Sequence, residues 1–216
     1  MKKTTNHMGN FNYSKQRKGD IFIDSEDNKL FLARRSKTLS EVSAIEAIAQ
    51  YGFAPIYLIG KDFILQKNID FTHRALELDQ LTNLLRLIHN NINEGKTLVH
   101  GDFGQHNTTF YNGEPRCFDF EYTHWGNPYI DIGRMVLREM GTEEEVIKFF
   151  FNYLGNVPRL SELRNGFIAF CQRQYKMRAE KNSKFMYIPL ERAKRLSKSK
   201  SNFSDLIKAF RDSIET

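Results

Sequence analysis

A short stretch of the chain, residues 98–133, concentrates side chains that can hold a metal ion or accept a proton. These side chains are His100, Asp102, Asn107, Asp119 and Asp131. Carboxylate and amide oxygens suit Mg²⁺, which proteins commonly bind together with the phosphates of a substrate. A further carboxylate can take the proton of a hydroxyl group. A base and two metal ligands in one short segment match the layout that phosphoryl transfer needs.

The spacing around the dipeptide Asn112-Gly113 predicts that a β-hairpin brings two of these ligands together. Asn-Gly is a strong turn signal, and β-prone residues 108–111 and 115–118 flank it. Pairing of position 108 with position 118 makes Asn107 face Asp119. We therefore expect the amide oxygen of Asn107 to lie beside the carboxylate of Asp119, with the preceding loop close to both.

The segments before this stretch predict a small β-rich unit with one helix. Its β-prone runs are residues 10–13, 20–23, 29–35, 54–60 and 62–69. Polar turns at residues 14–19 and 25–28 separate the first three runs, which indicates an antiparallel arrangement. An apolar stripe between residues 38 and 52, ended by Gly52, predicts the helix.

Helical patterns dominate after a predicted hinge near residues 67–70. Residues 74–92 carry leucines at helical spacing and predict a helix with a broad buried face. Most of residues 135–216 also reads as helical. We therefore expect an α+β protein with two lobes. Residues 1–68 form a small antiparallel β lobe with one helix, and residues 69–216 form a larger, mainly helical lobe that carries the hairpin.

Composition limits the kind of protein further. A chain of 216 residues, 40% of them hydrophobic, is long enough to bury a sizeable core. Cys117 and Cys171 lack the spacing of a metal site, so we expect two buried thiols and a reducing compartment. No apolar run is long enough to span a bilayer, and no secretion signal is visible, which predicts a soluble cytoplasmic protein.

Positive charge gathers in one region of the chain. Residues 173–200 contain ten Lys or Arg against two Glu, an excess larger than the formal net charge of +6. A solvated helical face and a site for an anionic partner or substrate both account for it. Nucleic acid is disfavoured as the partner, because neither aromatic interleaving nor a known nucleic-acid motif accompanies the charge.

Three motifs resemble those of a known group of enzymes. HGDFGQHN at residues 100–107, FDFEY at residues 118–122 and GNPYIDIG at residues 126–133 resemble the aminoglycoside phosphotransferase and choline kinase group. These small-molecule kinases have a bilobal protein-kinase-like fold, and the chain looks like a short member. The resemblance is specific over residues 98–134, weaker over residues 11–97, and fades after about residue 140.

The resemblance implies a role for each of the clustered side chains. ATP and Mg²⁺ are the implied cofactors. Asp102 is the implied catalytic aspartate, and Asn107 and Asp119 are the implied Mg²⁺ ligands. His100 and Asp131 are implied to brace the catalytic loop.

The small lobe matches the group less well. A kinase-like small lobe needs a cation on its third strand for the nucleotide phosphates, held by a glutamate of the helix. The matching place carries Ala33, Arg34 or Arg35 instead of the usual lysine, and we select Arg34 because choline kinases look similar in tolerating arginine. Its partner is Glu41 or Glu46, and we select Glu41 for its spacing and its place in the first helical turn.

The sequence predicts the residues that contact the adenine and the acceptor less exactly than it predicts the clustered side chains. The adenine is expected to meet backbone groups of the hinge near Lys67 to Ile69. Glu121, Tyr122 and Trp125 are candidate acceptor-binding residues, since aromatic rings with a nearby carboxylate can enclose an amino-alcohol. Packing is the alternative role for Trp125.

The expected acceptor is the hydroxyl group of a small molecule. Only eleven residues separate Asp119 from Asp131, too few for the activation segment of a protein kinase, and Gly101 replaces the Arg that would receive a regulatory phosphate. A sugar, an amino-alcohol and an anionic metabolite all remain as acceptors. A homodimer would complete the acceptor pocket if this short chain leaves it open.

A kinase-like nucleotide-binding regulatory module without turnover is the alternative function. The missing small-lobe lysine favours the module, whereas the intact Asp102, Asn107 and Asp119 favour an enzyme. Formation of ADP in the presence of hydroxyl acceptors separates the two.

Overall fold

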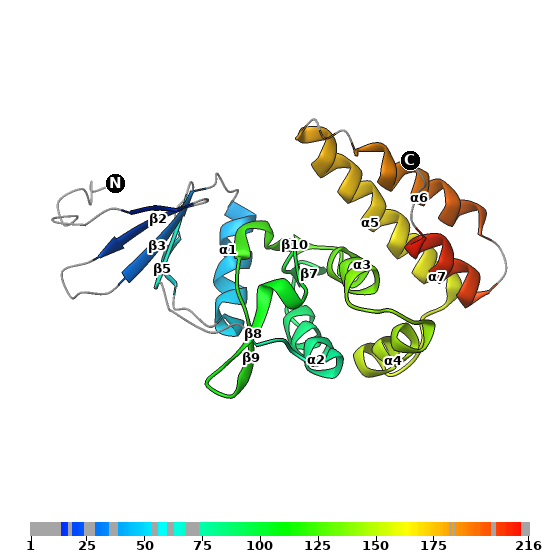
Figure 1. Cartoon of the computed structure of the whole chain (residues 1–216), viewed down its shortest axis with the longest axis horizontal. Coiled ribbons are helices and arrows are strands. Elements are labelled where there is room, and N and C mark those ends of the chain that lie inside the picture. Colours follow the sequence, from blue (N-terminus) through cyan, green and yellow to red (C-terminus); the bar gives the residue numbers. More distant parts are fainter. Residues whose placement is uncertain are drawn as a thin grey trace.

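The computed structural model describes most of the chain. The described residues are 14–16, 19–23, 29–34, 39–52, 56–59, 63–67, 74–181, 183, 185–199 and 202–212. The predicted strand at residues 10–13 and the turn at residues 25–28 lie outside these ranges. Figure 1 shows a strand-rich region at one end of the molecule and a group of helices at the other.

The first strands form one five-stranded antiparallel sheet. They are β1 (Ser14–Gln16), β2 (Gly19–Ile23), β3 (Lys29–Arg34), β4 (Ile56–Ile59) and β5 (Phe63–Lys67), in the spatial order β1-β2-β3-β5-β4. The predicted antiparallel arrangement is confirmed. The turn predicted at residues 14–19 is wrong in its first half, because residues 14–16 pair with β2 as an edge strand. Edge strands tolerate polar side chains, so polarity alone misidentified this segment.

The predicted helix of the small lobe is present as α1 (Leu39–Ile48), followed by a 3₁₀ turn (Ala49–Tyr51). Ala44, Ile45 and Ile48 are fully buried, as expected for one apolar stripe. These residues belong to the same hydrophobic core as the helices of the larger lobe. Figure 1 accordingly shows α1 between the five-stranded sheet and the rest of the molecule. The lobe boundary at residue 68 stays a prediction.

Six helices follow in the described part of the larger lobe. They are α2 (Leu78–His89), α3 (Tyr129–Arg138), α4 (Glu143–Leu154), α5 (Leu160–Glu180), α6 (Tyr187–Lys198) and α7 (Phe203–Arg211). They agree with the predicted helical character, except that α3 begins at Tyr129, before the predicted start near residue 135. The start predicted for α2 at residue 74 is wrong. Glu77 and Gln80 form a capping box that begins the helix at Leu78, and residues 74–77 precede it without helical structure.

Most of the short strands between the helices were not predicted from the sequence. β7 (Lys96–Val99) pairs with β6 (Ile92–Asn93) and with β10 (His124–Gly126), and β8 (Thr108–Tyr111) pairs with β9 (Glu114–Cys117). Only the β8–β9 hairpin was predicted. Strands of two to four residues carry too few side chains for a period to be recognised.

Helix packing fills the larger lobe with aromatic side chains. The rings of Phe167 and Phe210 stack with centroids 4.0 Å apart, which fastens α5 to α7. Both cysteines, Cys117 and Cys171, are free and buried, as predicted. Within the described residues, no helix is both long enough and apolar enough to cross a membrane.

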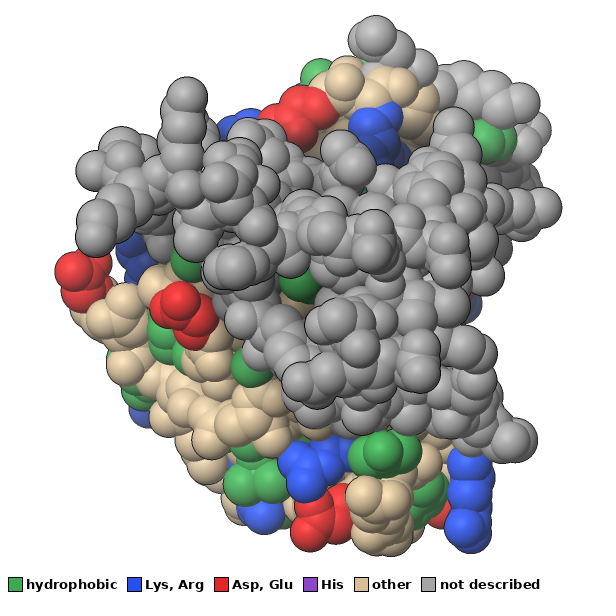
Figure 2. All heavy atoms as spheres, turned by 90° about the vertical axis from the view of Figure 1, so that its left-hand side faces the viewer, with side chains coloured by type: hydrophobic (Ala, Val, Ile, Leu, Met, Phe, Trp, Pro, Cys, Tyr) green, Lys and Arg blue, Asp and Glu red, His purple; other side chains and the backbone are tan. Residues whose placement is uncertain are grey.

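Figure 2 shows the face of the molecule that lies at the left of Figure 1. On the face that carries the first strands, the described basic, acidic and hydrophobic side chains are interspersed (Figure 2). The basic excess of residues 173–200 instead belongs to α5 and α6, at the opposite end in Figure 1.

Candidate active site

The β8–β9 hairpin forms with a register one residue away from the predicted one. Thr108 lies opposite Cys117, and the turn is the two-residue loop Asn112-Gly113, both with positive φ. A two-residue loop of this kind suits the twist of a hairpin, whereas the predicted pairing needed a three-residue loop. Asn107 consequently faces Phe118, whose N–H donates to the Asn107 carbonyl at 3.0 Å. Asp119 is the next residue along the chain, and its predicted place beside the Asn107 side chain stays a prediction.

The predicted catalytic loop, residues 100–107 between β7 and β8, is held by one buried carboxylate of α3. Asp131 is fully buried, and its two oxygens accept the backbone N–H groups of His100 and Gly101, each at 2.8 Å. His89 of α2 adds a contact at 3.1 Å from its Nε2 atom. This is the geometry that a bracing role for Asp131 requires.

The charge states in this brace follow from its surroundings. Burial alone would raise the pKa of Asp131. The hydrogen bond and charge of His89, together with the backbone N–H of His100, nevertheless hold that pKa below its usual value. Burial lowers the pKa of His100, which is therefore a neutral imidazole. Its Nε2 donates to the Phe118 carbonyl at 2.9 Å, so Nδ1 is left to accept the Asp102 N–H at 3.4 Å. His100 thus links the loop to the hairpin.

Glycine is required at position 101 by its backbone and by a close approach. Gly101 has φ of +84°, and a Cβ atom there would collide with the carbonyl oxygen of Tyr122. A side chain would therefore push the loop away from the segment after Asp119. The absence of arginine at this position thus has a steric reason.

We expect Asp131→Asn to destabilise the protein. The amide offers one acceptor in place of two, so a buried backbone N–H of the loop loses its partner, at a cost of about 3 kcal/mol. For a chain of this size the unfolding temperature should fall by roughly 6 to 12 °C. Thermal unfolding followed by circular dichroism measures the change. Asp79→Asn, at an exposed carboxylate of α2, is the matched control. Equal unfolding temperatures for both variants would show that Asp131 does not brace the loop.

Asp102 directly follows the two braced residues of the loop and faces two arginines of α3. Its carboxylate, 22% exposed, forms an ion pair with Arg134 and lies 3.5 Å from Arg138. His106 lies 3.5 Å from the same oxygen. The sequence reading missed both arginines, although a signal existed. Arg134 and Arg138 follow Asp131 by three and seven residues, which places all three on one face of α3.

Asn107 and Asp119 have the chemistry of Mg²⁺ ligands. The buried Asn107 donates its amide N–H to the Asp102 carbonyl at 2.9 Å, so its side-chain oxygen is the atom that can bind a cation. Asp119 is exposed and adopts a left-handed backbone conformation with φ of +61°. Among the described residues no cluster of three or more His, Cys, Asp or Glu side chains could hold a metal by itself. Two protein ligands nevertheless fit Mg²⁺, which takes its other ligands from phosphates and water.

The nucleotide-side predictions are only partly within the described structure. Arg34 is the last residue of β3, and Lys67 is the last residue of β5. Ile69 lies outside the described residues. Glu41 sits partly buried in the first turn of α1, whereas Glu46 is exposed. Burial therefore favours Glu41 over Glu46 as the partner of a small-lobe cation.

The three acceptor-side candidates follow Asp119 closely but face different neighbours. Glu121 and Tyr122 form a 3₁₀ turn with Phe120. Lys181, the residue directly after α5, donates to the Tyr122 hydroxyl at 3.2 Å and lies over its ring. The indole N–H of Trp125 donates to Ser43 Oγ of α1 at 2.9 Å. This contact agrees with a packing role for Trp125, which was the alternative to acceptor binding.

Comparison with known protein families agrees with this geometry. Residues 59–163 match the family model described as Phosphotransferase enzyme family. The matched segment contains the catalytic loop, the β8–β9 hairpin and α3, and therefore the whole cluster from His100 to Asp131. No curated protein sequence matches the chain. The family match supports a small-molecule phosphotransferase.

Solved structures of small-molecule kinases share the fold. Choline kinase LicA from Streptococcus pneumoniae gives a TM-score of 0.58 at 13% identity, with 86% of this chain and 90% of that chain covered. A choline/ethanolamine kinase family protein from Mesorhizobium loti gives 0.53 at 12% identity, with 96% and 94% covered. APH(2")-IIa, in a complex with streptomycin and ATP, gives 0.52 at 14% identity, with 82% and 89% covered. The resemblance predicted from residues 98–134 is confirmed, and the chain has this protein-kinase-like fold.

Proposed function

We propose that this protein transfers the γ-phosphoryl group of ATP to a hydroxyl group of a small molecule. The observation that carries the proposal is the way Asn107 ties the loop to the hairpin. Its side chain donates to the Asp102 carbonyl, and its own carbonyl accepts the N–H of Phe118, next to Asp119. One base and two metal ligands are thereby held in a single compact unit.

In the proposed reaction Asp102 accepts the proton of the acceptor hydroxyl while the hydroxyl oxygen bonds to the γ-phosphorus. The bond from that phosphorus to the bridging oxygen breaks, and ADP leaves with that oxygen. Asn107 and Asp119 would hold Mg²⁺, which neutralises negative charge on the phosphates when it is bound. The brace from Asp131 keeps the base in position, because it fixes the backbone on the N-terminal side of Asp102.

The nucleotide is proposed to lie between the five-stranded sheet and the catalytic loop. Glu41 would orient Arg34 toward the phosphates, an assignment supported by the partly buried place of Glu41 at the start of α1. Backbone groups near Lys67 and Ile69 are proposed to meet the adenine, as the resemblance implies.

The acceptor is proposed to approach from the side of the segment that follows Asp119. Glu121 and Tyr122 are the candidate contacts there, because the backbone of Tyr122 packs against Gly101, directly before Asp102. The indole N–H of Trp125 is already bonded to Ser43, so Trp125 would contribute only through its ring.

Formation of ADP tests the proposed function directly. The intact protein is supplied with ATP, Mg²⁺ and a panel of neutral sugars, amino-alcohols, sugar phosphates and sugar acids. We expect ADP above the acceptor-free background with at least one class, and its loss when Mg²⁺ is chelated. Binding of Mg-ATP without acceptor-dependent ADP across the whole panel would instead support a regulatory nucleotide-binding module.

A further inference from the structure

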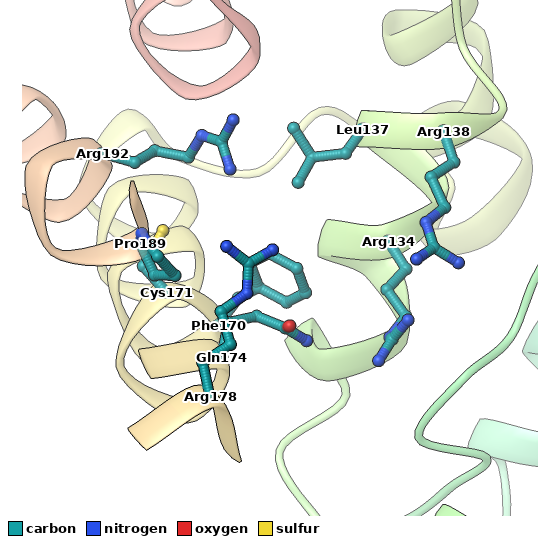
Figure 3. A pocket seen from close by; sticks show the side chains of 9 residues that line it. All are labelled: Arg134, Leu137, Arg138, Phe170, Cys171, Gln174, Arg178, Pro189 and Arg192. Carbon is teal, nitrogen blue, oxygen red and sulfur yellow. The ribbon is translucent and has the colours of Figure 1, made fainter. Parts of the chain in front are cut away.

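A pocket between three helices of the larger lobe is lined by arginines. α3 contributes Arg134 and Arg138, α5 contributes Arg178, and α6 contributes Arg192. In Figure 3 the side chains of Arg178 and Arg192 reach toward the middle of this space, and Arg134 and Arg138 border it from α3. The cavity volume is about 90 Å³, several times the roughly 15 Å³ that one water molecule needs. A small oxyanion group fits, whereas pockets for whole drug-sized ligands are about 300 Å³ or larger.

The polar side chains that line the pocket are mainly hydrogen-bond donors. None of the residues that line it is Asp or Glu. Three buried nitrogen atoms of its side chains lack a hydrogen-bond partner within the part of the chain that the structure describes. They are Nε of Arg134, Nε of Arg192 and Nε2 of Gln174. Since buried donors are normally paired, and the Arg134 side chain is only 9% exposed, these atoms mark a place for a ligand that accepts hydrogen bonds.

The like charges in the pocket also favour an anionic ligand. Burial lowers the pKa of Arg134, and the charge of Arg138 lowers it further. Burial lowers the pKa of Arg192 as well, with further lowering by Arg195 and Arg178. Arginine nevertheless keeps its proton in proteins, so these shifts mean that burial, and to a smaller extent the neighbouring arginines, make the positive charges costly in free energy. For Arg134 the carboxylate of Asp102 offsets part of this cost. An oxyanion between them would offset the repulsion and accept several charge-assisted hydrogen bonds.

We propose that the acceptor molecule carries an oxyanion group, a phosphate or a carboxylate, and that the arginine pocket of α3, α5 and α6 binds it. This inference rests on the proposed kinase function and narrows its acceptor class. Arg134 connects the pocket to the chemistry, because its side chain lines the pocket while a terminal nitrogen of its guanidinium group contacts Asp102. The guanidinium group of Arg134 therefore separates the bound oxyanion from the base, Asp102. The hydroxyl that receives phosphate therefore sits on a neighbouring part of the same molecule.

Cationic acceptors match this surrounding poorly. A polycationic aminoglycoside would meet like charge in the pocket. A choline-type ammonium group needs open aromatic faces, but Lys181 already lies over the ring of Tyr122, with Nζ 5.4 Å from the centroid. The indole of Trp125 is tied to α1. The arrangement selects for negative charge on the acceptor.

The test compares acceptors that differ in one acidic group. The intact protein, with ATP and Mg²⁺ at fixed ionic strength, is given glycerol, glycerol 3-phosphate and glycerate, and then glucose, glucose 6-phosphate and gluconate. We expect kcat/KM for ADP formation to be at least about tenfold higher for an acidic member than for its neutral counterpart, since a hydrogen-bonded charge contributes about 1.5–3 kcal/mol. The phosphate and carboxylate members show which oxyanion the pocket prefers.

Variants of α6 separate the pocket from general charge. Arg192→Gln should lower the ratio of kcat/KM for acidic over neutral acceptors by roughly 10- to 100-fold. Arg192→Lys should restore this ratio only partly, because lysine keeps the charge but not the two-pronged geometry. Lys194→Gln removes the same charge from a side chain of α6 that is 65% exposed and outside the pocket. This control should leave the ratio within about twofold, as expected for a screened surface charge.

Arg178→Gln tests the pocket from a second helix, in case Arg192→Gln unfolds. Thermal unfolding shows whether each variant is folded. Equal kcat/KM for acidic and neutral acceptors, or equal effects of Arg192→Gln and Lys194→Gln, would overturn the pocket assignment while turnover itself upholds the kinase function. Calorimetric titration of the same acceptors in the presence of ADP tests the pocket even if the protein has no kinase activity. Binding of the acidic members that is lost in Arg192→Gln, without ADP formation from any acceptor, would uphold the pocket and refute the kinase function.

Discussion

Asp102→Asn should reduce the rate of phosphoryl transfer by about 10² to 10⁴ while leaving the affinity for Mg-ATP within a few fold. The amide keeps the size and polarity of the side chain but cannot accept the proton of the acceptor hydroxyl, and a general base contributes rate enhancement of this order. Steady-state kcat with the preferred acceptor measures the first effect, and calorimetric titration of Mg-ATP measures the second. Asp79→Asn, the same chemical change at an exposed site of α2, should change neither.

The ion pair with Arg134 adds a structural consequence to this substitution. Arg134 is mostly buried and contacts the Asp102 carboxylate, so the variant leaves its charge less well balanced. We expect a loss of about 1 to 3 kcal/mol in the free energy of unfolding, and kinetics should be measured well below the unfolding temperature. If the loss in turnover came with an equal loss in nucleotide affinity, Asp102 would be a nucleotide-binding group and its role as a base would be wrong.

The fold was predictable from the sequence wherever a pattern extended over many residues. The α+β class, α1 and the long helices from α2 onward all follow from apolar spacing that repeats over several turns. The errors lie in short segments. Ser14–Gln16 is a polar edge strand, and the three-stranded sheet of β6, β7 and β10 is built from strands of two to four residues. In such segments the pairing partner determines the structure, and single-strand patterns carry little information.

The candidate site, too, was predicted in part from the sequence. Asp102, Asn107, Asp119 and Asp131 were recognised because they lie within one continuous segment with a turn signal. The hairpin register was wrong by one residue because Asn-Gly forms a two-residue loop, a choice that turn geometry makes rather than strand composition.

The arginine pocket was beyond the reach of sequence analysis. Its residues come from three different helices and extend from Arg134 to Arg192 along the chain. The excess charge of residues 173–200 hinted at an anionic ligand but did not distinguish Arg192, which enters the pocket, from Lys194, which faces solvent. Only the packing of α3 and α6 against α5 makes this distinction.

Asp119→Ala should weaken Mg²⁺-dependent binding of ATP by roughly 100-fold or more, because even groups that only orient a metal ligand contribute about 10- to 100-fold. Asp119 is exposed, so the fold should persist. Its left-handed backbone, with φ of +61°, is easier for Asp or Asn than for Ala. Asp119→Asn therefore removes the carboxylate while keeping this backbone preference, and it should lose a similar share of affinity with less loss of stability.

Calorimetric titration of ATP, with Mg²⁺ and with a chelator, separates metal binding from other effects of Asp119→Ala and Asp119→Asn. With the chelator, both variants and the unaltered protein should bind ATP equally weakly, because the ligand carboxylate has no cation to hold. Glu114→Gln, at an exposed carboxylate of the same hairpin that pairs with Arg116, is the control for charge and should retain full affinity. A difference that persisted without Mg²⁺ would mean that Asp119 acts on the nucleotide through the hairpin backbone rather than through the metal.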